Sequence, residues 1–228
     1  MSSIKGAVFD MDGLMLDTEK LFLRFWKEAS KQFGYDMKDE HVFRIRSLSR
    51  RYSVPLLKDM FGQDFPFESV RNRRIELMNE YINENGFEVK KGLFELLDYL
   101  KSNGYKIAVA TATPRERAVK YLKSIDAYGL FDAVICGDMV TNGKPDPDIY
   151  LTASRHLGLL PEQCVAFEDS SNGLKSAHSA GCYTIMIPDL TQPDEVSMQY
   201  TDAVYESLDK AVDFFERSAL LEKQCECV

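Results

Sequence analysis

Cysteine and long hydrophobic runs are both scarce in this chain of 228 residues. Three of its five cysteines, Cys136, Cys164 and Cys182, lie in apolar, strand-like segments, as reduced core residues do. We interpret Cys225 and Cys227, at the extreme tail, as part of a frayed terminus rather than a soft-metal site. No apolar run approaches the ~18 residues that span a bilayer, and the chain does not start with a long apolar stretch. These absences predict a cytoplasmic protein without a membrane partner.

Lysine and arginine are also fewer than the acidic residues. The chain has 28 lysines and arginines against 36 acids, a formal net charge of −8, which argues against nucleic acid or an anionic membrane as the partner. The deficit is uneven: residues 18–88 hold thirteen basic and twelve acidic side chains, whereas the remainder has a net charge of −9. The three histidines lack metalloprotease spacing and Gly-x-Ser-x-Gly is absent, so zinc proteases and serine hydrolases have no support.

The hydrophobic residues, 45% of the chain, suffice for one sizeable core and a smaller insertion. From residue 93 onward, short apolar runs alternate with segments of helical spacing. This alternation predicts an α/β fold, a Rossmann-like parallel-sheet core with helices on both faces. The expected strands are 7–9, 106–111, 133–136, 164–167, 183–187 and 203–205. The expected helices are 93–100, 115–125, one from Pro147 to Gly158 with Asp146 as its N-cap, one from Ser170 or Ser171, and 208–215.

Residues 18–88 are predicted to form an inserted, all-helical unit. Apolar residues recur at helical spacing from Phe22 to Phe33 and again from Ile75 to Ile82. Between these segments, Arg44 to Phe61 is interpreted as a loop and a short helix around Pro55. Each helix has one apolar face to bury, which favours a small bundle. The expected domains are an α/β catalytic core (1–17 and 89–217), a helical cap (18–88) and a C-terminal tail (218–228).

Two aspartates follow the first apolar run, where Phe9 is succeeded by Asp10-Met11-Asp12-Gly13. In an open α/β sheet, ligands bind in the crevice beyond the carboxyl ends of the strands, so acids placed there face a ligand rather than the core. Asp10 and Asp12 project to the same side of an extended chain, where their charges repel unless a cation or a proton is shared. Oxygen ligands predict a hard divalent cation, and Mg²⁺ is the usual one where water and phosphate complete its coordination. For this tetrapeptide taken alone, a solvated turn is the alternative.

Later apolar runs also end in polar residues, namely Thr111, Lys144 and the pair Glu168-Asp169. Together with the first acids they supply carboxylates, a hydroxyl and an ammonium. This combination suits a metal-bound phosphoryl group, because carboxylates hold the cation while the hydroxyl and the ammonium orient and neutralise phosphate oxygens. Taken singly, Thr111 also fits a helix cap and Lys144 a surface lysine.

Four segments, DMDGLMLDT, VATATP, GKPDPDIY and FEDSSNG, resemble in order and spacing the four motifs of the haloacid dehalogenase-like phosphohydrolase superfamily. The resemblance extends from about Lys5 to about Phe215. It is strongest to the branch that contains β-phosphoglucomutase and small sugar-phosphate phosphatases, in which a helical cap follows the first strand. The resemblance implies an aspartyl-phosphate intermediate and a small phosphorylated metabolite as substrate.

The resemblance also implies a role for each polar residue. Asp10 is the nucleophile, and Asp12 protonates the leaving oxygen and later takes a proton from water. The metal ligands are the Asp10 side chain, the Asp12 backbone carbonyl and Asp169, with Glu168 binding directly or through water. The residues expected to bind the phosphate are Thr111 through its hydroxyl, Ala112 through its amide, and Lys144.

Four arginines cluster in the helical insertion at Arg44, Arg46, Arg50 and Arg51. They form either a solvated basic face or, for one or two of them, contacts to the substrate's phosphate or polar body. The mutases that the chain resembles have a Lys-Gly-Val-Ser-Arg-like loop where this chain has residues 46–50, Arg-Ser-Leu-Ser-Arg. Arg50 matches and is a candidate for phosphate binding, whereas Ser47 replaces the glycine, which favours a phosphatase.

We therefore predict a Mg²⁺-dependent phosphatase of a small phosphorylated metabolite, with a phosphohexomutase as the alternative. A phospho-acceptor switch of the response-regulator kind also combines acids, a hydroxyl and a lysine around Mg²⁺, but it needs no helical insertion after its first strand. An inactive metal-binding paralogue is a third possibility, although every catalytic position is filled. The sequence specifies neither the particular substrate nor the oligomeric state, and a monomer is compatible with it.

Overall fold

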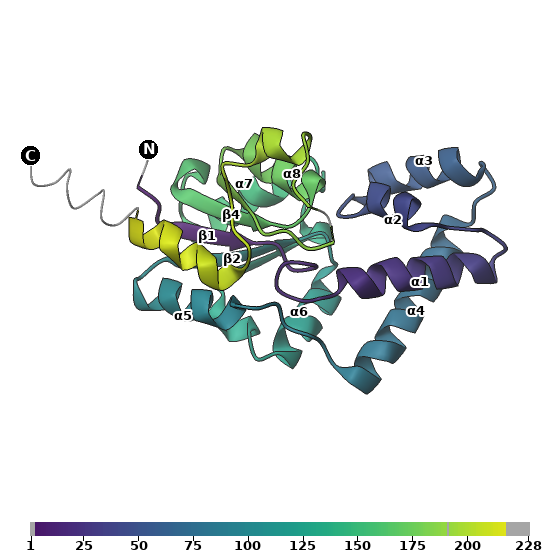
Figure 1. Cartoon of the computed structure of the whole chain (residues 1–228), viewed down its shortest axis with the longest axis horizontal. Helices are drawn as coiled ribbons and strands as arrows, with labels where there is room; N and C mark the ends of the chain where they lie inside the picture. Colours follow the sequence, from purple (N-terminus) through teal and green to yellow (C-terminus); the bar gives the residue numbers. More distant parts are fainter. Residues whose placement is uncertain (1–2, 191, 218–228) are drawn as a thin grey trace, which may run out of the picture.

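The core of the molecule is a six-stranded sheet. The computed structural model describes residues 3–190 and 192–217 (Figure 1), so the predicted tail with Cys225 and Cys227 lies outside the described residues. All neighbouring strands are parallel, in the order β3-β2-β1-β4-β5-β6. The strands are β1 (Gly6–Phe9), β2 (Lys106–Thr111), β3 (Ala133–Cys136), β4 (Cys164–Glu168), β5 (Tyr183–Met186) and β6 (Ala203–Val204). Every predicted strand is present, and the predicted fold class is confirmed.

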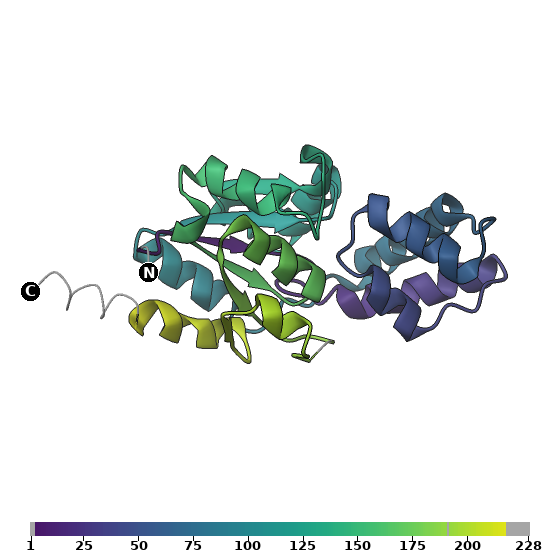
Figure 2. The ribbon, with the colours of Figure 1, turned by 90° about the horizontal axis from the view of Figure 1, so that it is seen from above.

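Helices cover both faces of this sheet (Figures 1 and 2). The four main ones are α5 (Leu93–Ser102), α6 (Arg115–Ser124), α7 (Asp148–Leu157) and α8 (Ser171–Ala180). In β1, Ala7 and Phe9 pack into the apolar cluster that contains α5 and α6, whereas Val8 packs into the cluster with α7 and α8. Strands buried on both faces have continuous apolar runs rather than alternating ones, and this pattern made them recognisable in the sequence.

Short helical turns complete the core. Four 3₁₀ turns lie at Tyr128–Leu130, Gly137–Met139, Pro161–Gln163 and Ser197–Tyr200. The predicted final helix begins as a 3₁₀ turn, Leu208–Ala211, and continues as helical backbone over 212–217. No helix in the described part of the chain is both long and apolar enough to cross a membrane.

The predicted all-helical insertion is present between β1 and α5 and lies at one end of the sheet (Figure 1). Its helices are α1 (Glu19–Gln32), α2 (Asp39–Ile45), α3 (Arg50–Phe61) and α4 (Phe67–Asn85). α1 packs on α4 through aromatic side chains: the ring centroids of Trp26 and Phe67 are 6.0 Å apart and those of Phe25 and Tyr81 are 5.8 Å apart. Phe25 and Trp26 belong to the stripe predicted on the first helix, whereas Phe67 precedes the stripe predicted from Ile75 to Ile82 and Phe33 is exposed.

The predicted loop and helix around Pro55, over Arg44 to Phe61, are both present, but their bounds differ from the prediction. α2 already begins at Asp39, and α3 is a full helix of 12 residues. Only Val42 and Ile45 of α2 are buried apolar residues, too few to produce a recognisable stripe. α3 contains Pro55 in its interior, where proline usually ends a helix, and for this reason the predicted helix was shorter than the true one.

The predicted N-cap of α7 is wrong. The helix begins at Asp148 with Pro147 in the N-cap position. The Asp146 carboxylate instead accepts a hydrogen bond of 2.7 Å from the hydroxyl of Tyr52 in α3. Because this partner is 94 residues away in the chain, no local pattern could indicate it.

Candidate active site

Three acids meet at the carboxyl ends of β1 and β4. Asp10 follows β1, Glu168 ends β4 and Asp169 comes next, and one oxygen of each lies within 4.8 Å of the other two. All three side chains are buried. The Asp12 side chain, which the sequence places beside Asp10, lies outside this cluster and faces a cavity.

Burial and mutual repulsion perturb these acids. Burial raises the pKa of Asp10 well above its ordinary value, although the positive charge of Lys144 acts to lower it. The carboxylates of Glu168 and Asp169 raise this pKa further. Burial raises the pKa of Asp169 to about 6. Among the described residues, Asp169 Oδ1 has no hydrogen-bond partner. A cluster of carboxylates with an unpartnered buried oxygen fits a hard divalent cation.

Lys144 lies inside the acid cluster rather than on the surface. Its side chain is fully buried, and its Nζ donates to Asp10 Oδ1 at 2.5 Å and to Glu168 Oε1 at 2.6 Å. Burial alone would lower the pKa of Lys144, but the two carboxylates raise it above its ordinary value. The hydroxyl of Tyr150 in α7 also donates to Glu168 Oε1, at 2.5 Å. Lys144 therefore carries a fixed positive charge beside Asp10.

Asp12 is held by three hydroxyl groups. Thr18 Oγ1 donates to one carboxylate oxygen at 2.8 Å, and Thr113 Oγ1 and Thr111 Oγ1 contact the other at 2.7 and 3.3 Å. Thr111, expected to bind phosphate, thus contacts Asp12 in this structure and also accepts a hydrogen bond from the Thr113 amide. Sequence reasoning missed the contacts of Thr18 and Thr113, although both lie within the motifs that carried the resemblance.

Two glycines allow this close packing of acids. Gly13 has φ of +88°, and a Cβ there would collide with the carboxylate of Asp169. Gly173, in the first turn of α8, lies against the Glu168 carboxylate in the same way. A larger residue at either position would have to displace an acid of the cluster.

Arg46 contacts the acid cluster directly. It directly follows α2 and is buried, and its guanidinium pairs with the Asp169 side chain and lies 3.1 Å from the Asp169 backbone oxygen. It also lies 3.2 Å from the carboxylate of Glu19, whose pKa burial raises well above its ordinary value. Arg46 therefore fits neither expectation for this arginine cluster: it does not lie on a solvated face or line the cavity, but pairs with two buried acids.

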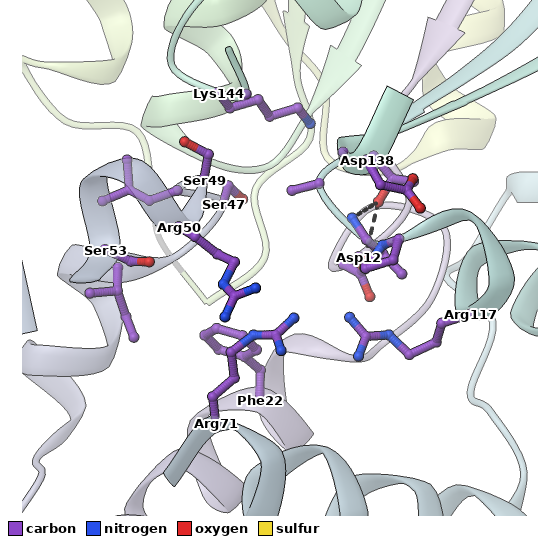
Figure 3. Close-up of a pocket in the computed structure, with 18 of the residues that line it drawn as sticks. Asp12, Phe22, Ser47, Ser49, Arg50, Ser53, Arg71, Arg117, Asp138 and Lys144 are labelled. Atoms are coloured by element: carbon purple, nitrogen blue, oxygen red, sulfur yellow. Dashed lines mark hydrogen bonds between the residues drawn. The ribbon is translucent and has the colours of Figure 1, made fainter. Parts of the chain in front are cut away.

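A cavity of about 410 Å³ opens beside Asp10, Asp12 and Lys144 and extends to the helical insertion (Figure 3). The predicted phosphate-binding residues Thr111, Ala112 and Arg50 line it as well. In this structure the Arg50 guanidinium pairs with Glu68, and both side chains are exposed. Three further arginines that the sequence did not single out line the cavity, namely Arg71, Arg74 and Arg117.

Comparison with known proteins gives consistent results. Residues 7–187 match the family model described as haloacid dehalogenase-like hydrolase. A phosphorylated carbohydrates phosphatase of Thermotoga maritima is 34% identical over 182 residues, which are 78% of this chain and 82% of that protein. The β-phosphoglucomutase of Bacillus subtilis is 27% identical over 190 residues, covering 80% and 82% of the two chains. A crystal structure of CbbY from Rhodobacter sphaeroides in complex with phosphate has a TM-score of 0.76 at 28% identity, with 91% of this chain and 96% of that one covered.

Proposed function

Because this chain belongs to the haloacid dehalogenase-like hydrolase family, we propose that it is a phosphoric monoester hydrolase acting on a small phosphorylated metabolite such as a sugar phosphate. One observation carries the proposal. The buried ammonium of Lys144 lies against Asp10 at the edge of a cavity into which Asp12 also faces. A nucleophile, a fixed positive charge and a second acid are thereby combined where a phosphate ester can enter.

In the proposed reaction, a carboxylate oxygen of Asp10 attacks phosphorus while the bond from phosphorus to the leaving oxygen breaks. Asp12 donates its proton to that oxygen, and the aspartyl-phosphate remains on Asp10. Water then attacks the phosphorus of this intermediate and gives a proton to Asp12, which releases phosphate and restores the Asp10 carboxylate. Thr18 and Thr113 orient the Asp12 carboxyl for both proton transfers.

Lys144 supports the attack by neutralising phosphate oxygens. Its ammonium keeps its proton because two carboxylates contact it, so it remains positive throughout the reaction. Thr111 and Ala112 line the same cavity, and we propose that the Thr111 hydroxyl and the Ala112 amide orient the phosphate. Arg50 is proposed to contact the distal part of the substrate after releasing Glu68.

The cluster fits Mg²⁺, which when bound would supply the positive charge that lowers the repulsion between the attacking carboxylate and the phosphate. Asp10 and Asp169 would hold it through their side chains and Asp12 through its backbone carbonyl, with Glu168 binding directly or through water. The unpartnered Oδ1 of Asp169 supports this assignment.

A phosphohexomutase is the second candidate, and one observation favours it. Ser47 has φ of +57°, a left-handed conformation that favours glycine, and the mutases that the chain resembles have glycine at this position. The loop thus keeps a backbone conformation suited to glycine although the residue differs.

The test is a panel of sugar phosphates incubated with the full chain and Mg²⁺, with free phosphate and isomerised sugar phosphate measured in parallel. We expect phosphate release to dominate. Efficient isomerisation of β-glucose 1-phosphate in the presence of the bisphosphate activator, with negligible free phosphate, would establish the mutase instead. If no ester is turned over, including p-nitrophenyl phosphate, the proposed activity is excluded.

A further inference from the structure

The part of the cavity formed by the helical insertion contains positive charge that the proposed chemistry does not use. Arg71 and Arg74 come from α4, and Arg117 comes from α6 of the core. Figure 3 shows the guanidinium groups of Arg71 and Arg117 pointing toward each other across the cavity, on the side away from Lys144. The helical insertion and the core thus each contribute arginines to the same cavity.

These three arginines are not held in ion pairs in the described part of the chain. Within residues 3–190 and 192–217, none of them forms an ion pair with a carboxylate. Arg73, their neighbour on α4, is different, because it lies outside the cavity and pairs with Glu76 and Glu80. An arginine on this helix can therefore find an acid, and those that face the cavity do not.

Arg74 is the most unusual of the three. Its side chain is only 6% exposed, and among the described residues its Nε has no hydrogen-bond partner. The guanidinium lies over the rings of Phe22 and Trp26, at 4.8 and 5.6 Å from their centroids. Aromatic rings offset part of the cost of burying a cation, but they accept none of its hydrogen bonds in the plane of the guanidinium.

The cluster is also electrostatically strained. Burial, together with the charges of Arg117 and Arg71, lowers the pKa of Arg74 to about 9. Burial and the charges of Arg50 and Arg117 lower the pKa of Arg71 as well. Three cations that repel one another are stabilised when an anion enters between them.

The position of Asp12 indicates which part of a substrate reaches this cluster. In the proposed reaction Asp12 protonates the leaving oxygen, so the leaving group extends from Asp12 into the rest of the cavity. Asp12 is among the charges that act on Arg74, and Figure 3 shows Asp12 between Lys144 and the pair formed by Arg71 and Arg117. The leaving group is therefore directed toward Arg71, Arg74 and Arg117.

Resting on the proposed phosphatase function, we propose that the leaving group carries a second phosphate, which Arg71, Arg74 and Arg117 bind. The preferred substrate is accordingly a small bisphosphate, of which one phosphate is transferred to Asp10 and the other remains on the released product. A phosphate has three terminal oxygens and two charges and can accept bonds from several guanidinium groups, whereas a carboxylate is satisfied by a single arginine. A cavity of about 410 Å³ is of the size that binds small molecules.

The test compares substrates that differ only in the second phosphate. Phosphate release is measured with the full chain and Mg²⁺ for glucose 1-phosphate against glucose 1,6-bisphosphate and for fructose 6-phosphate against fructose 1,6-bisphosphate, with 6-phosphogluconate as the carboxylate counterpart. We expect kcat/KM to be at least ~10-fold higher for one of the bisphosphates than for its monophosphate, because charge-assisted hydrogen bonds to the second phosphate strengthen binding in the transition state.

Arg71→Gln and Arg117→Gln identify the residues responsible. Each should reduce kcat/KM for the preferred bisphosphate about 10-fold or more and change that for the monophosphate by less than about 3-fold. Arg73→Gln is the matched control on the same helix and should leave both values unchanged. These positions are chosen because Arg71 and Arg117 are only partly buried, whereas replacement of Arg74 could prevent folding.

Binding supplies a readout that does not depend on turnover. Trp26 is the single tryptophan of the chain, and Arg74 lies over its ring, so its fluorescence should respond when an anion reaches the cluster. Titration of the Asp10→Asn variant should show tighter binding of the bisphosphate than of the monophosphate, and Arg117→Gln in that background should remove the difference.

Failure of this inference differs from failure of the proposed function. Phosphate release without preference for either bisphosphate, or a preference for 6-phosphogluconate alone, contradicts the proposed binding of a second phosphate. Either result remains consistent with the proposed phosphatase activity. Absence of turnover with every ester rejects the phosphatase. Equal binding of mono- and bisphosphates to Asp10→Asn overturns the arginine subsite whatever the activity.

Discussion

At the residue scale, Asp10 is the proposed nucleophile, because it lines the cavity and contacts the buried ammonium of Lys144. Asp10→Asn keeps the volume and removes the carboxylate, so we expect kcat to fall at least ~10³-fold, the scale of losing a covalent nucleophile. The melting temperature and the circular dichroism spectrum should remain close to those of the parent. Activity within tenfold of the parent would refute the assignment of Asp10 as nucleophile.

Asp169 should couple metal binding to pH. Its pKa is about 6 in the folded protein, so below that pH a proton occupies the carboxyl and competes with Mg²⁺. We expect Mg²⁺ affinity, measured by isothermal titration calorimetry, to increase from about pH 5 to about pH 7 and then to level off. Asp169→Ala should weaken Mg²⁺ binding and activity together, with partial rescue at high Mg²⁺. A metal titration unchanged by this substitution would place the cation elsewhere.

The same shift predicts how the metal-free protein's stability depends on pH. The folded-state pKa of Asp169 is raised above the ordinary value of 3.8, so its contribution is fully present below about pH 4 and is lost as the pH rises to about 6. Urea denaturation without Mg²⁺ should show a decline in the free energy of unfolding across this window, smaller in Asp169→Asn. An equal decline in the variant would assign it to other groups.

At the scale of elements, Arg46 connects the end of α2 to the sheet. Its guanidinium lies between Asp169 and Glu19, so Arg46→Gln leaves two buried carboxylates without their cation. We expect the free energy of unfolding without Mg²⁺ to fall by about 3–5 kcal/mol at pH 7, the usual effect of breaking a buried ion pair. Mg²⁺ should then raise the melting temperature more in the variant than in the parent, because it restores positive charge to the acids.

Arg44→Gln is the control for this prediction. It lies one residue before Ile45 on the same helix, but its side chain is exposed. We expect its stability and its response to Mg²⁺ to match those of the parent. An identical Mg²⁺-induced shift for Arg46→Gln and the parent would argue that Mg²⁺ does not bind next to Asp169.

At the scale of the whole molecule, the helical insertion contacts the core through polar side chains beside the cavity. Tyr52 donates to Asp146 and Arg51 donates to Asn142, each at 2.7 Å. These bonds hold α3 over the loop that contains Lys144, and access of water and release of product require such contacts to open.

The double variant Arg51→Ala/Tyr52→Phe should therefore weaken substrate binding without slowing the chemical step. We expect KM for the preferred metabolite to rise several-fold with kcat unchanged or higher, since closure over the substrate is weakened and opening is eased. Stability should change by no more than about 1–2 kcal/mol, because hydrogen bonds outside the core contribute little. A large fall in kcat with KM unchanged would indicate that these bonds position the catalytic groups instead.

Local patterns in the sequence sufficed for the sheet and for the identity of the acids. Strands buried on both faces appear as short apolar runs, and the polar residue that ends each run marks the edge where ligands bind. Asp10, Lys144, Glu168 and Asp169 were predicted to meet for this reason, and they do meet in the structure. Their catalytic roles remain predictions that the variants above address.

Only the tertiary structure decided what surrounds those acids. Arg46 reaches Asp169 across 123 residues of sequence, and Arg71 and Arg117 meet in one cavity although they belong to different parts of the chain. Helical periodicity indicates which face of a helix is apolar, but it does not indicate which distant side chains the opposite face will meet. The burial that shifts the pKa values of Arg74 and Asp169 likewise arises only when separate elements pack together. The sequence by itself therefore determined which groups react, and the packing determined the charges and the burial around them.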